Sequence, residues 1–354
     1  MSTVHNTNNN GRKHPTIRRS ITRLIALAFG LAVLLSAQFM ALPAAAAQSG
    51  ATKPVSATVV AEYEQGEFLE SVAFDRHGNM YVTSAFKGVI YKLAPDGTQT
   101  TFATFPVGEG DFGQQSGAVL TLVLDRGGIV YATVQHPDPT LHGVWRIAPD
   151  GTKAVVATLP LDAQPNGITI DRRGNLFVAD SALGIIWRIE RGTSEAKIWI
   201  EDDLLRPAGP AGFPGANGVK FYHNDLYASN SSTGNIVRIS VQPDGSAGQV
   251  LVYATGVPTD DFAFDVLGNI YATTHPFNTV VKIGRDGTQT VIATPEQNVI
   301  GPTAAAFGVR GADRLNLYVV TDGGLFGQLI DPNSPAGPPS IVRLEVGVPG
   351  LPIR

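Results

Sequence analysis

Short apolar segments separated by glycine-containing turns recur along most of this chain. The fullest version is an apolar strand, a turn that closes in Gly-Asn or Gly-Gly, and a second strand that begins beside an aromatic residue. It occupies residues 73–82, 122–131 and 168–177, and weaker versions follow. The marker aromatics stand 44 to 50 residues apart, at Tyr81, Tyr131, Phe177, Tyr227, Tyr271 and Tyr318. Self-similarity at a nearly fixed period is the signature of a repeat architecture.

A third strand and an Asp-Gly turn follow most of these copies. The turns are Asp96-Gly97, Asp150-Gly151, Asp244-Gly245 and Asp286-Gly287. Between alternating apolar segments, Asp-Gly favours a hairpin because glycine accepts a positive φ without steric cost. An outer strand, such as residues 101–104, completes each unit. Four short antiparallel strands at this period describe one blade of a β-propeller.

Six units fill residues 67 to about 347. They predict an all-β protein, a six-bladed β-propeller of four-stranded antiparallel blades that forms one domain over residues 54–354. A lone strand at residues 57–63 precedes the first unit. We expect it to pair with the last blade and close the ring, since closure removes open sheet edges. We expect no helix of any length in this domain.

The first 47 residues have the layout of a secretory signal peptide. A basic segment without acidic residues is followed by an apolar run over residues 24–35 and a small-residue stretch that ends at Ala47. This order predicts cleavage after Ala47, residues 48–53 as a linker, and a mature protein that is secreted or periplasmic. The alternative is a retained membrane anchor, because residues 24–42 are just long enough to span a bilayer. Arg18-Arg19 faintly resembles a twin-arginine export signal.

Charge and cysteine content narrow the classes of partner. The chain has no cysteine, which excludes a disulfide framework. Removing residues 1–47 takes away five basic residues and leaves 21 Lys and Arg against 30 Asp and Glu, a net charge near −9. This balance argues against nucleic acid and anionic membranes as partners and is compatible with binding a cation. We expect a monomer that acts on a small molecule and has no membrane contact once the signal peptide is removed.

The repeat also predicts where a site would lie. In a propeller the innermost strand of each blade lines the central channel, and the loop entering it lies at one mouth, where such folds place their sites. Counting back eleven residues from each marker aromatic reaches this entry, with adjustments for a shorter turn in blade 4 and an insertion in blade 6. The six equivalent positions are Glu70, Leu120, Asn166, Asn217, Asp260 and Thr303. Four of them carry carboxylate or amide oxygens, and the ring geometry directs these four toward one point.

Simpler explanations exist for each residue taken alone. Asn166-Gly167 and Asn217-Gly218 are common turn dipeptides, and Glu70 and Asp260 could be solvated charges at the rim. Their shared register favours a common site, because two carboxylates that converge in a narrow channel repel each other and a divalent cation relieves this repulsion. Oxygen ligands without cysteine or histidine favour Ca²⁺, Mg²⁺ or Mn²⁺ over zinc.

Other polar residues are expected near the same mouth. Asp261 and Gln164 flank the four positions, and Asp111, Gln114 and Gln115 lie in the connection between blades 1 and 2. Residues 209–215 precede Asn217 and could form a lid or a spacer. Further rim candidates follow second strands, namely Ser84, Asp180, Asn230 and Asp322. His136 and His275 also follow second strands, each before a proline, and we interpret them as loop residues rather than ligands.

Four phrases at these positions resemble a known family. They are Glu70-Ser71-Val72-Ala73-Phe74, Pro165-Asn166-Gly167, Ala216-Asn217-Gly218-Val219-Lys220-Phe221 and Asp260-Asp261-Phe262-Ala263-Phe264-Asp265. They are similar to the phrases of the senescence marker protein/gluconolactonase (regucalcin-like) family, whose members are six-bladed propellers. The resemblance implies a calcium-dependent lactone hydrolase in which Glu70, Asn217 and Asp260 bind the metal and Asn166 lies at the metal or its substrate. A metal-bound water would then lose its proton most readily to Asp260, the candidate catalytic residue.

Departures from the family pattern leave the substrate open. Ser71-Val72 stands where the family usually has Gly-Pro, and Asp261 replaces a glycine. Gln164 replaces the arginine that sugar-lactone hydrolases tend to keep for binding the sugar. The leading hypothesis is an exported, metal-dependent hydrolase of a lactone or related ester. The alternatives are a non-catalytic ligand-binding propeller with a structural metal, and a Mg²⁺-dependent carbon–oxygen lyase that uses a histidine base.

Overall fold

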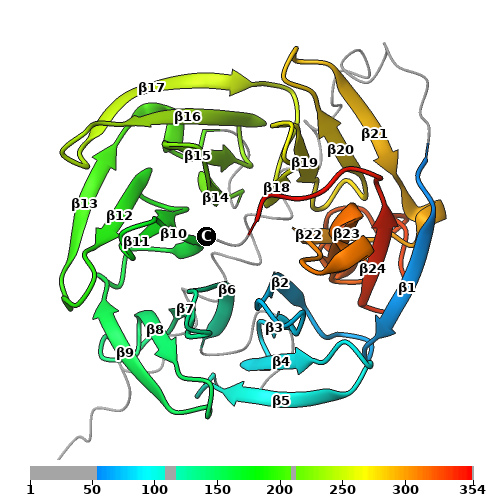
Figure 1. Cartoon of the computed structure of the whole chain (residues 1–354), viewed down its shortest axis with the longest axis horizontal. Coiled ribbons are helices and arrows are strands. Elements are labelled where there is room, and N and C mark those ends of the chain that lie inside the picture. Colours follow the sequence, from blue (N-terminus) through cyan, green and yellow to red (C-terminus); the bar gives the residue numbers. More distant parts are fainter. Residues whose placement is uncertain (1–53, 108–116, 209–212, 353–354) are drawn as a thin grey trace, which may run out of the picture.

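A computed structural model describes residues 54–107, 117–208 and 213–352. The predicted signal peptide, Asp111, Gln114 and Gln115 lie outside these ranges, as does part of the loop before Asn217. Six four-stranded antiparallel sheets are arranged around a central axis, so the predicted six-bladed propeller is confirmed (Figure 1). In the described part of the chain, no helix has the length and apolar character needed to cross a membrane.

The first three blades follow one another along the chain, each from its inner to its outer strand. Blade 1 comprises β2 (Leu69–Phe74), β3 (Met80–Ser84), β4 (Val89–Leu93) and β5 (Gln99–Thr104). Blade 2 comprises β6 (Ala118–Leu124), β7 (Val130–Gln135), β8 (Gly143–Ile147) and β9 (Lys153–Thr158). Blade 3 comprises β10 (Pro165–Ile170), β11 (Leu176–Asp180), β12 (Ile185–Ile189) and β13 (Ala196–Glu201).

The last three blades repeat this order, except that the outer strand of blade 6 comes from the start of the domain. Blade 4 comprises β14 (Ala216–Tyr222), β15 (Asp225–Asn230), β16 (Asn235–Val241) and β17 (Ala247–Ala254). Blade 5 comprises β18 (Phe262–Phe264), β19 (Ile270–Thr273), β20 (Val280–Ile283) and β21 (Gln289–Ala293). Blade 6 comprises β22 (Pro302–Phe307), β23 (Asn316–Thr321), β24 (Ser340–Glu345) and β1 (Ala57–Glu62).

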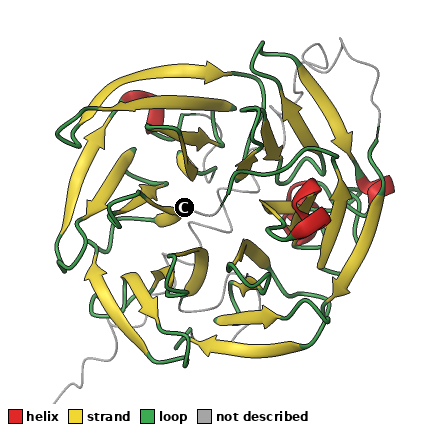
Figure 2. Cartoon of the chain, viewed as in Figure 1, coloured by secondary structure: helices red, strands yellow, loops and turns green. Residues whose placement is uncertain are grey.

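The ring closes through β1. This strand pairs antiparallel with β24, with Ala57 opposite Leu344 and Glu62 opposite Ser340, as the sequence predicted. The pairing joins the two ends of the domain within one sheet and covers an edge that would otherwise be open. Helical structure is confined to connections (Figure 2): the 3₁₀ turns Asp203–Leu205, Pro295–Gln297 and Gly311–Leu315, and the α-helix α2 (Leu325–Ile330). The expectation of no helix was therefore wrong only for short loop segments.

The repeated Asp and Gly residues have a defined local role in the turns. Asp75 accepts backbone hydrogen bonds from His77 and Asn79 at 2.8 and 2.9 Å, and Gly78 adopts a φ of 86° between them. Glycine reaches this left-handed region at little cost. The turn after each inner strand therefore specifies where the second strand begins. The same carboxylate caps recur at Asp125, Asp171 and Asp265.

Apolar clusters bridge neighbouring blades and hold the inner strands in place. One cluster packs Tyr81 and Ile90 of blade 1 against Leu122, Val130 and Trp145 of blade 2. Fully burying side chains of this size contributes about 1.5–3 kcal/mol each relative to leaving them exposed. Because similar clusters occur between the other blades, the inner strands form a rigid support for polar side chains at the channel mouth.

Candidate functional site

Hydrogen bonds between blades show that four of the six counted positions are structurally equivalent. A hydroxyl two residues after the marker aromatic of one blade donates to the backbone carbonyl of the counted position in the next blade. The pairs are Thr83 with Leu120 (2.6 Å), Thr133 with Asn166 (2.8 Å), Ser229 with Asp260 (2.9 Å) and Thr273 with Thr303 (2.9 Å). The period of the sequence therefore gave the correct register, and this belt of hydroxyls fixes the backbone beneath the site.

Ala179 and Val320 stand where the two remaining belt hydroxyls would be. At these interfaces nearby hydroxyls donate instead: Ser181 donates to the Ala216 carbonyl at 2.8 Å, and Thr303 donates to the Leu69 carbonyl at 2.7 Å. Both acceptors directly precede a counted position. The belt is thus complete around the ring, although its register shifts by one residue at two interfaces.

Asn166-Gly167 and Asn217-Gly218 are not turns. They lie inside the inner strands β10 and β14, where the pairing with β11 and β15 is interrupted between Pro165 and Ile168 and between Ala216 and Val219. Such bulges re-aim side chains and are common beside active sites. A β-carbon on Gly167 would collide with the backbone carbonyl of Asn217, so glycine is required for the inner strands of blades 3 and 4 to approach this closely.

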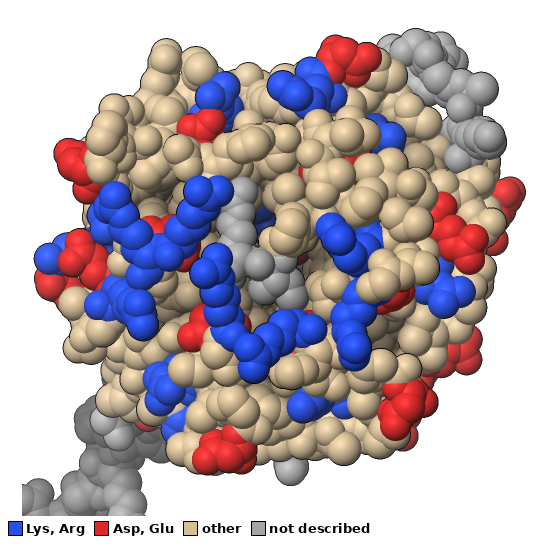
Figure 3. Space-filling view, in the orientation of Figure 1, with Lys and Arg blue, Asp and Glu red and all other residues tan. Residues whose placement is uncertain are grey.

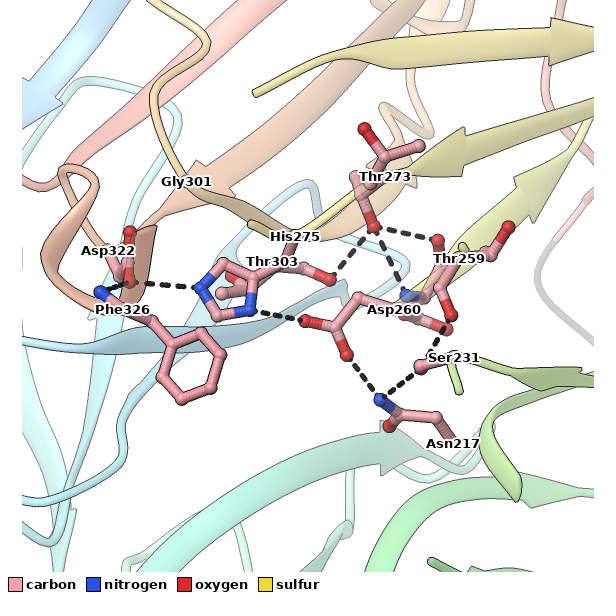
Figure 4. A network of polar contacts seen from close by, with 12 residues as sticks. Asn217, Ser231, Thr259, Asp260, Thr273, His275, Gly301, Thr303, Asp322 and Phe326 are labelled. Carbon is pink, nitrogen blue, oxygen red and sulfur yellow. Dashed lines mark hydrogen bonds and ion pairs between the residues drawn. The ribbon is translucent and has the colours of Figure 1, made fainter. Parts of the chain in front are cut away.

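A chain of polar contacts links blades 4, 5 and 6 across the mouth (Figure 4). Asn217 donates from Nδ2 to Ser231 Oγ at 3.0 Å and to Asp260 Oδ1 at 2.5 Å. The other oxygen of Asp260 lies 3.4 Å from His275 Nδ1, and His275 Nε2 lies 3.0 Å from Asp322 Oδ2. Asn217, Asp260, His275 and Asp322 are all buried or nearly so. The chain therefore has little contact with bulk water.

The protonation states of this chain follow from burial and charge. Burial by itself would lower the pKa of His275, but the carboxylates of Asp322 and Asp260 raise it to about 10. His275 is accordingly a cation held between two carboxylates. Burial raises the pKa of Asp260, while its contacts with His275 and Asn217 act in the opposite direction. Asp260 therefore combines a fixed orientation with a proton affinity above that of an ordinary aspartate.

Glu70 and Asn166 bring oxygen atoms that the described residues do not satisfy. The Glu70 side chain is buried, and among the described residues its carboxylate accepts no hydrogen bond. Burial, followed by the nearby charge of Asp260, raises its pKa well above the ordinary value for glutamate. Asn166 Oδ1 is also buried without a hydrogen-bond partner. Unsatisfied buried oxygens of this kind call for a bound cation, a proton or an ordered water.

The donor set of the mouth fits a hard divalent cation. Glu70 and Asp260 supply carboxylate oxygens, and Asn166 and Asn217 supply amide oxygens, which is the chemistry that Ca²⁺ and Mg²⁺ prefer. Within the described ranges no three His, Asp or Glu side chains form a metal-binding group by themselves, so any such site depends on the two asparagines. The assignment of Glu70, Asn217 and Asp260 as ligands, with Asn166 at the metal or substrate, stays a prediction.

The remaining rim candidates have structural roles. Asp180 is fully buried, and its carboxylate accepts hydrogen bonds from the backbone of Gln164, Ala182 and Leu183 and from Trp187 Nε1. It is therefore not free at the rim, and it fixes the loop in which Gln164 lies. Ser84 and Asn230 likewise bond to neighbouring loops.

Asp261, another rim candidate, is held by a lysine. It forms an ion pair with Lys220, whose Nζ lies 2.6 Å and 2.9 Å from its two oxygens. Consecutive residues of an extended segment point in opposite directions, so Asp260 faces the polar chain while Asp261 faces Lys220. A lysine therefore neutralises the second aspartate of the pair.

His275 is the residue that the sequence interpretation missed. The interpretation of a loop residue holds for His136, which contacts the Pro106 carbonyl and the backbone N–H of Asp138. His275 also lies in a loop, after β19, but its ring joins Asp260 to Asp322. A signal was available, because Asp322 and His275 both follow second strands in adjacent blades. Their contact depends on side-chain direction, which the repeat does not specify.

Aromatic side chains pack around His275. Phe68 lies edge-on to the imidazole with ring centroids 5.6 Å apart, and Phe326 of α2 lies 5.2 Å from it. Phe326 also contacts Phe213 at 6.4 Å, and Phe213 comes from the connection between blades 3 and 4. Leu120, at the counted position of blade 2, joins the same apolar cluster. The polar chain is thus bordered by an apolar cover, made of side chains from blades 1, 2 and 6 and from the connection between blades 3 and 4.

Comparisons with known proteins support the fold. The sequence matches no protein-family profile and no curated protein sequence. The structure is similar to the calcium-binding protein regucalcin of Agrobacterium tumefaciens, at 15% identity over 86% of this chain and 100% of the other, with a TM-score of 0.64. It is also similar to a gluconolactonase of Xanthomonas campestris, at 16% identity over 87% and 93% of the two chains, with a TM-score of 0.57.

A third similar structure has a different activity in its name. Virginiamycin B lyase of Staphylococcus aureus is 18% identical over 76% of this chain and 82% of the other, with a TM-score of 0.52. Structures with hydrolase and lyase names therefore share this propeller. At these identities the likeness establishes the fold, and the function has to be argued from the site.

Proposed function

We propose that this chain is an exported, metal-dependent hydrolase of an uncharged lactone or related ester. The observation that carries the proposal is the pair of buried carboxylates, Glu70 and Asp260, set beside the unsatisfied oxygen of Asn166 and the amide of Asn217. His275 is the one cation in this group and is shared between Asp260 and Asp322, so among the described residues Glu70 has no hydrogen-bonded cation of its own. A divalent cation would supply the missing positive charge, and Ca²⁺ is the first candidate, ahead of Mg²⁺ or Mn²⁺. When bound, a cation of this kind polarises a substrate carbonyl and lowers the pKa of a coordinated water.

Asp260 is the residue best placed to accept a proton. Asn217 and His275 hold its two oxygens from opposite sides, which fixes the direction of the carboxylate. Its raised pKa moves it toward the range in which a general base works at neutral pH. His275 already carries its proton and contacts a carboxylate through each ring nitrogen. It is therefore a positioning residue for Asp260.

The same property of His275 argues against the lyase alternative. A histidine base must be neutral and must direct a free nitrogen toward the substrate. His275 meets neither condition, because its pKa of about 10 keeps it protonated and each of its ring nitrogens contacts a carboxylate. A binding propeller with a structural metal remains the competing function, and only turnover separates it from a hydrolase.

The apolar cover supports a substrate with an apolar group. Phe68, Phe213 and Phe326 line the approach to the polar chain, and Gln164 occupies the position at which related sugar-lactone hydrolases are expected to carry an arginine. A polyhydroxylated sugar lactone would lose hydrogen bonds to water here without gaining charged partners. An alkyl- or aryl-substituted lactone or ester would bury its apolar group against the aromatic rings.

The deciding experiment combines metal binding with turnover. Protein expressed from residue 48 onward, dialysed against EDTA, is titrated with Ca²⁺ by calorimetry and then assayed on alkyl γ- and δ-lactones, aryl esters and gluconolactone. We expect about one Ca²⁺ per chain and hydrolysis that requires it, with product masses that show addition of water. Tight Ca²⁺ binding without turnover of any substrate would favour the binding propeller, and a product mass without added water would favour a lyase.

A further inference from the structure

A pocket at the opposite end of the inner strands carries an excess of positive charge. It has a volume of about 450 Å³ and lies between blades 3 and 4. Asn166 and Asn217 stand near the starts of β10 and β14, whereas the pocket is formed by residues that end or follow these strands, including Arg172, Arg173 and Phe221. It is therefore separate from the mouth described above. Its volume falls within the range of small-molecule sites.

Two arginine side chains converge on one point of this pocket. The place that a β-carbon on Gly245 would occupy is 3.4 Å from Nη1 of Arg188 and 3.7 Å from Nη1 of Arg173. Arg188 packs over the Phe177 ring and donates to the Gly245 carbonyl, while its Nε is buried without a hydrogen-bond partner. Arg172 adds a third guanidinium to the lining. Two guanidinium groups that approach the same point repel each other, and an anion bound between them would offset this repulsion.

The nearby carboxylates are already engaged. Asp171 lines the pocket, but one of its oxygens accepts from the backbone of Arg173 and Asn175, and the other accepts from Asn175 Nδ2. Asp244 accepts from the backbone and hydroxyl of Ser246. Glu190 reaches Arg188 at 3.5 Å from the solvent side, with 56% of its side chain exposed. No carboxylate among the described residues forms an ion pair with Arg172 or Arg173. With three arginines and one aspartate in its lining, the pocket has a net positive charge in an acidic protein.

Blade 3 contributes an arginine that the repeated turn of blade 2 lacks. Figure 3 shows Lys and Arg side chains over the blade that β10 to β13 form in Figure 1, and others elsewhere on the same face. The equivalent turn of blade 2 has Arg126 where blade 3 has Arg172, but Gly127 where blade 3 has Arg173. Arg173 is thus an addition to the repeated turn, which needs no cation at that position for its own geometry.

We propose that this pocket binds a small organic polyanion, either a di- or tricarboxylate or a phosphate ester. Guanidinium groups form paired hydrogen bonds with carboxylate and phosphate oxygens, and an anion placed between Arg173 and Arg188 relieves their repulsion. The lining has three arginines against the one carboxylate of Asp171, a net charge of +2, which favours a ligand with at least two negative charges. The proposal is independent of the activity at the channel mouth.

The test measures anion binding by calorimetry and thermal unfolding at constant ionic strength. Citrate and inorganic phosphate serve as the probes, and acetate and chloride as monovalent controls. Protein and buffers are first passed over a chelating resin to remove divalent cations, so that chelation of a cation by citrate does not contribute. We expect saturable binding of citrate, of phosphate or of both at one site per chain, and a rise in Tm beyond that in chloride. A preference between the two probes distinguishes a carboxylate ligand from a phosphate ligand.

Matched variants connect this binding to the pocket. Arg173→Gln removes one converging cation and should weaken binding at least tenfold, while Arg126→Gln removes the cation of the equivalent turn in blade 2 and should leave it unchanged. Both positions are exposed, so the Tm without anion should stay near that of the wild type. Absence of saturable binding, or equal losses in the two variants, would overturn the proposal.

Discussion

Asn217 and Asp260 are joined twice, once through their side chains and once through the backbone beside them. Asn217 Nδ2 donates to Asp260 Oδ1 at 2.5 Å, and the N–H of Gly218 donates to the Asp260 carbonyl at 2.9 Å. The inner strands of blades 4 and 5 are therefore locked together at the point where the proposed site lies. The position of Asp260 does not depend on its charge alone. An isosteric substitution, Asp260→Asn, can therefore remove the charge while the side chain stays in place.

Asp260→Asn should abolish most of the hydrolytic activity while the protein stays folded. The amide keeps the shape of the side chain but cannot accept a proton, and loss of a general base costs about 10²–10⁴ in rate. The measurement is kcat on the best substrate of the lactone and ester panel, with circular dichroism as the folding check. Asp261→Asn is the control, since Asp261 faces Lys220 and should retain kcat within a few-fold. Equal losses in both variants would show that Asp260 has no special role.

Glu70→Gln should stabilise the metal-free protein and remove its response to Ca²⁺. Glu70 is a buried carboxylate without a hydrogen bond among the described residues, and Asp260 opposes its ionisation, so an uncharged side chain relieves an unfavourable charge. A gain of about 1–3 kcal/mol in the free energy of unfolding is expected without metal. Thermal and urea unfolding with EDTA and with Ca²⁺ measure both effects.

Glu67→Gln, measured under the same conditions, should lower the stability of the metal-free protein instead of raising it. Glu67 accepts hydrogen bonds from Ser84, Lys87 and Tyr91, so its charge is compensated and its loss should destabilise the protein. Its stabilisation by Ca²⁺ should remain that of the wild type. If Glu70→Gln instead lowers stability in EDTA and keeps the Ca²⁺ effect, Glu70 is not a ligand.

The repeat allowed the ring, its closure by β1 and the register of the inner strands to be predicted, because each rests on a local pattern that recurs six times. The contact of Asn217 with Asp260 followed from the same register. The His275–Asp322 contact did not, because it depends on the direction of side chains in two loops of different sequence. The hydrogen bonds of the Asp180 carboxylate to its own loop could not be predicted for a related reason, because spacing does not reveal side-chain direction.

Phe213→Ala and Phe326→Ala should weaken the binding of apolar substrates. The two rings meet across the mouth at 6.4 Å, so removing either one opens the cover and takes away apolar surface from the proposed substrate. For a long-chain alkyl lactone we expect KM to rise about tenfold with a smaller change in kcat, and for a short-chain lactone little change. The comparison of kcat and KM over a series of chain lengths provides the measurement.

Phe102→Ala, which removes a ring that packs on Tyr81 away from the mouth, is the control. A uniform loss for all chain lengths would mean that the rings support the fold rather than the substrate.

His142 should make the protein less stable as the pH falls below neutrality. Its imidazole is buried in blade 2, where Nδ1 accepts the backbone N–H of His136, and burial lowers its pKa from the ordinary value of 6.5. The unfolded chain therefore binds a proton more readily than the folded protein. The stabilisation is fully present above pH 6.5 and is lost as the pH falls from 6.5 toward the lower pKa of the folded state. Urea unfolding at several values between pH 8 and pH 5 measures how the free energy of unfolding depends on pH.

His142→Asn, which keeps an acceptor for His136, should flatten this slope of stability against pH, whereas His77→Asn at an exposed turn should not. An unchanged slope in His142→Asn would assign the acid sensitivity to other groups.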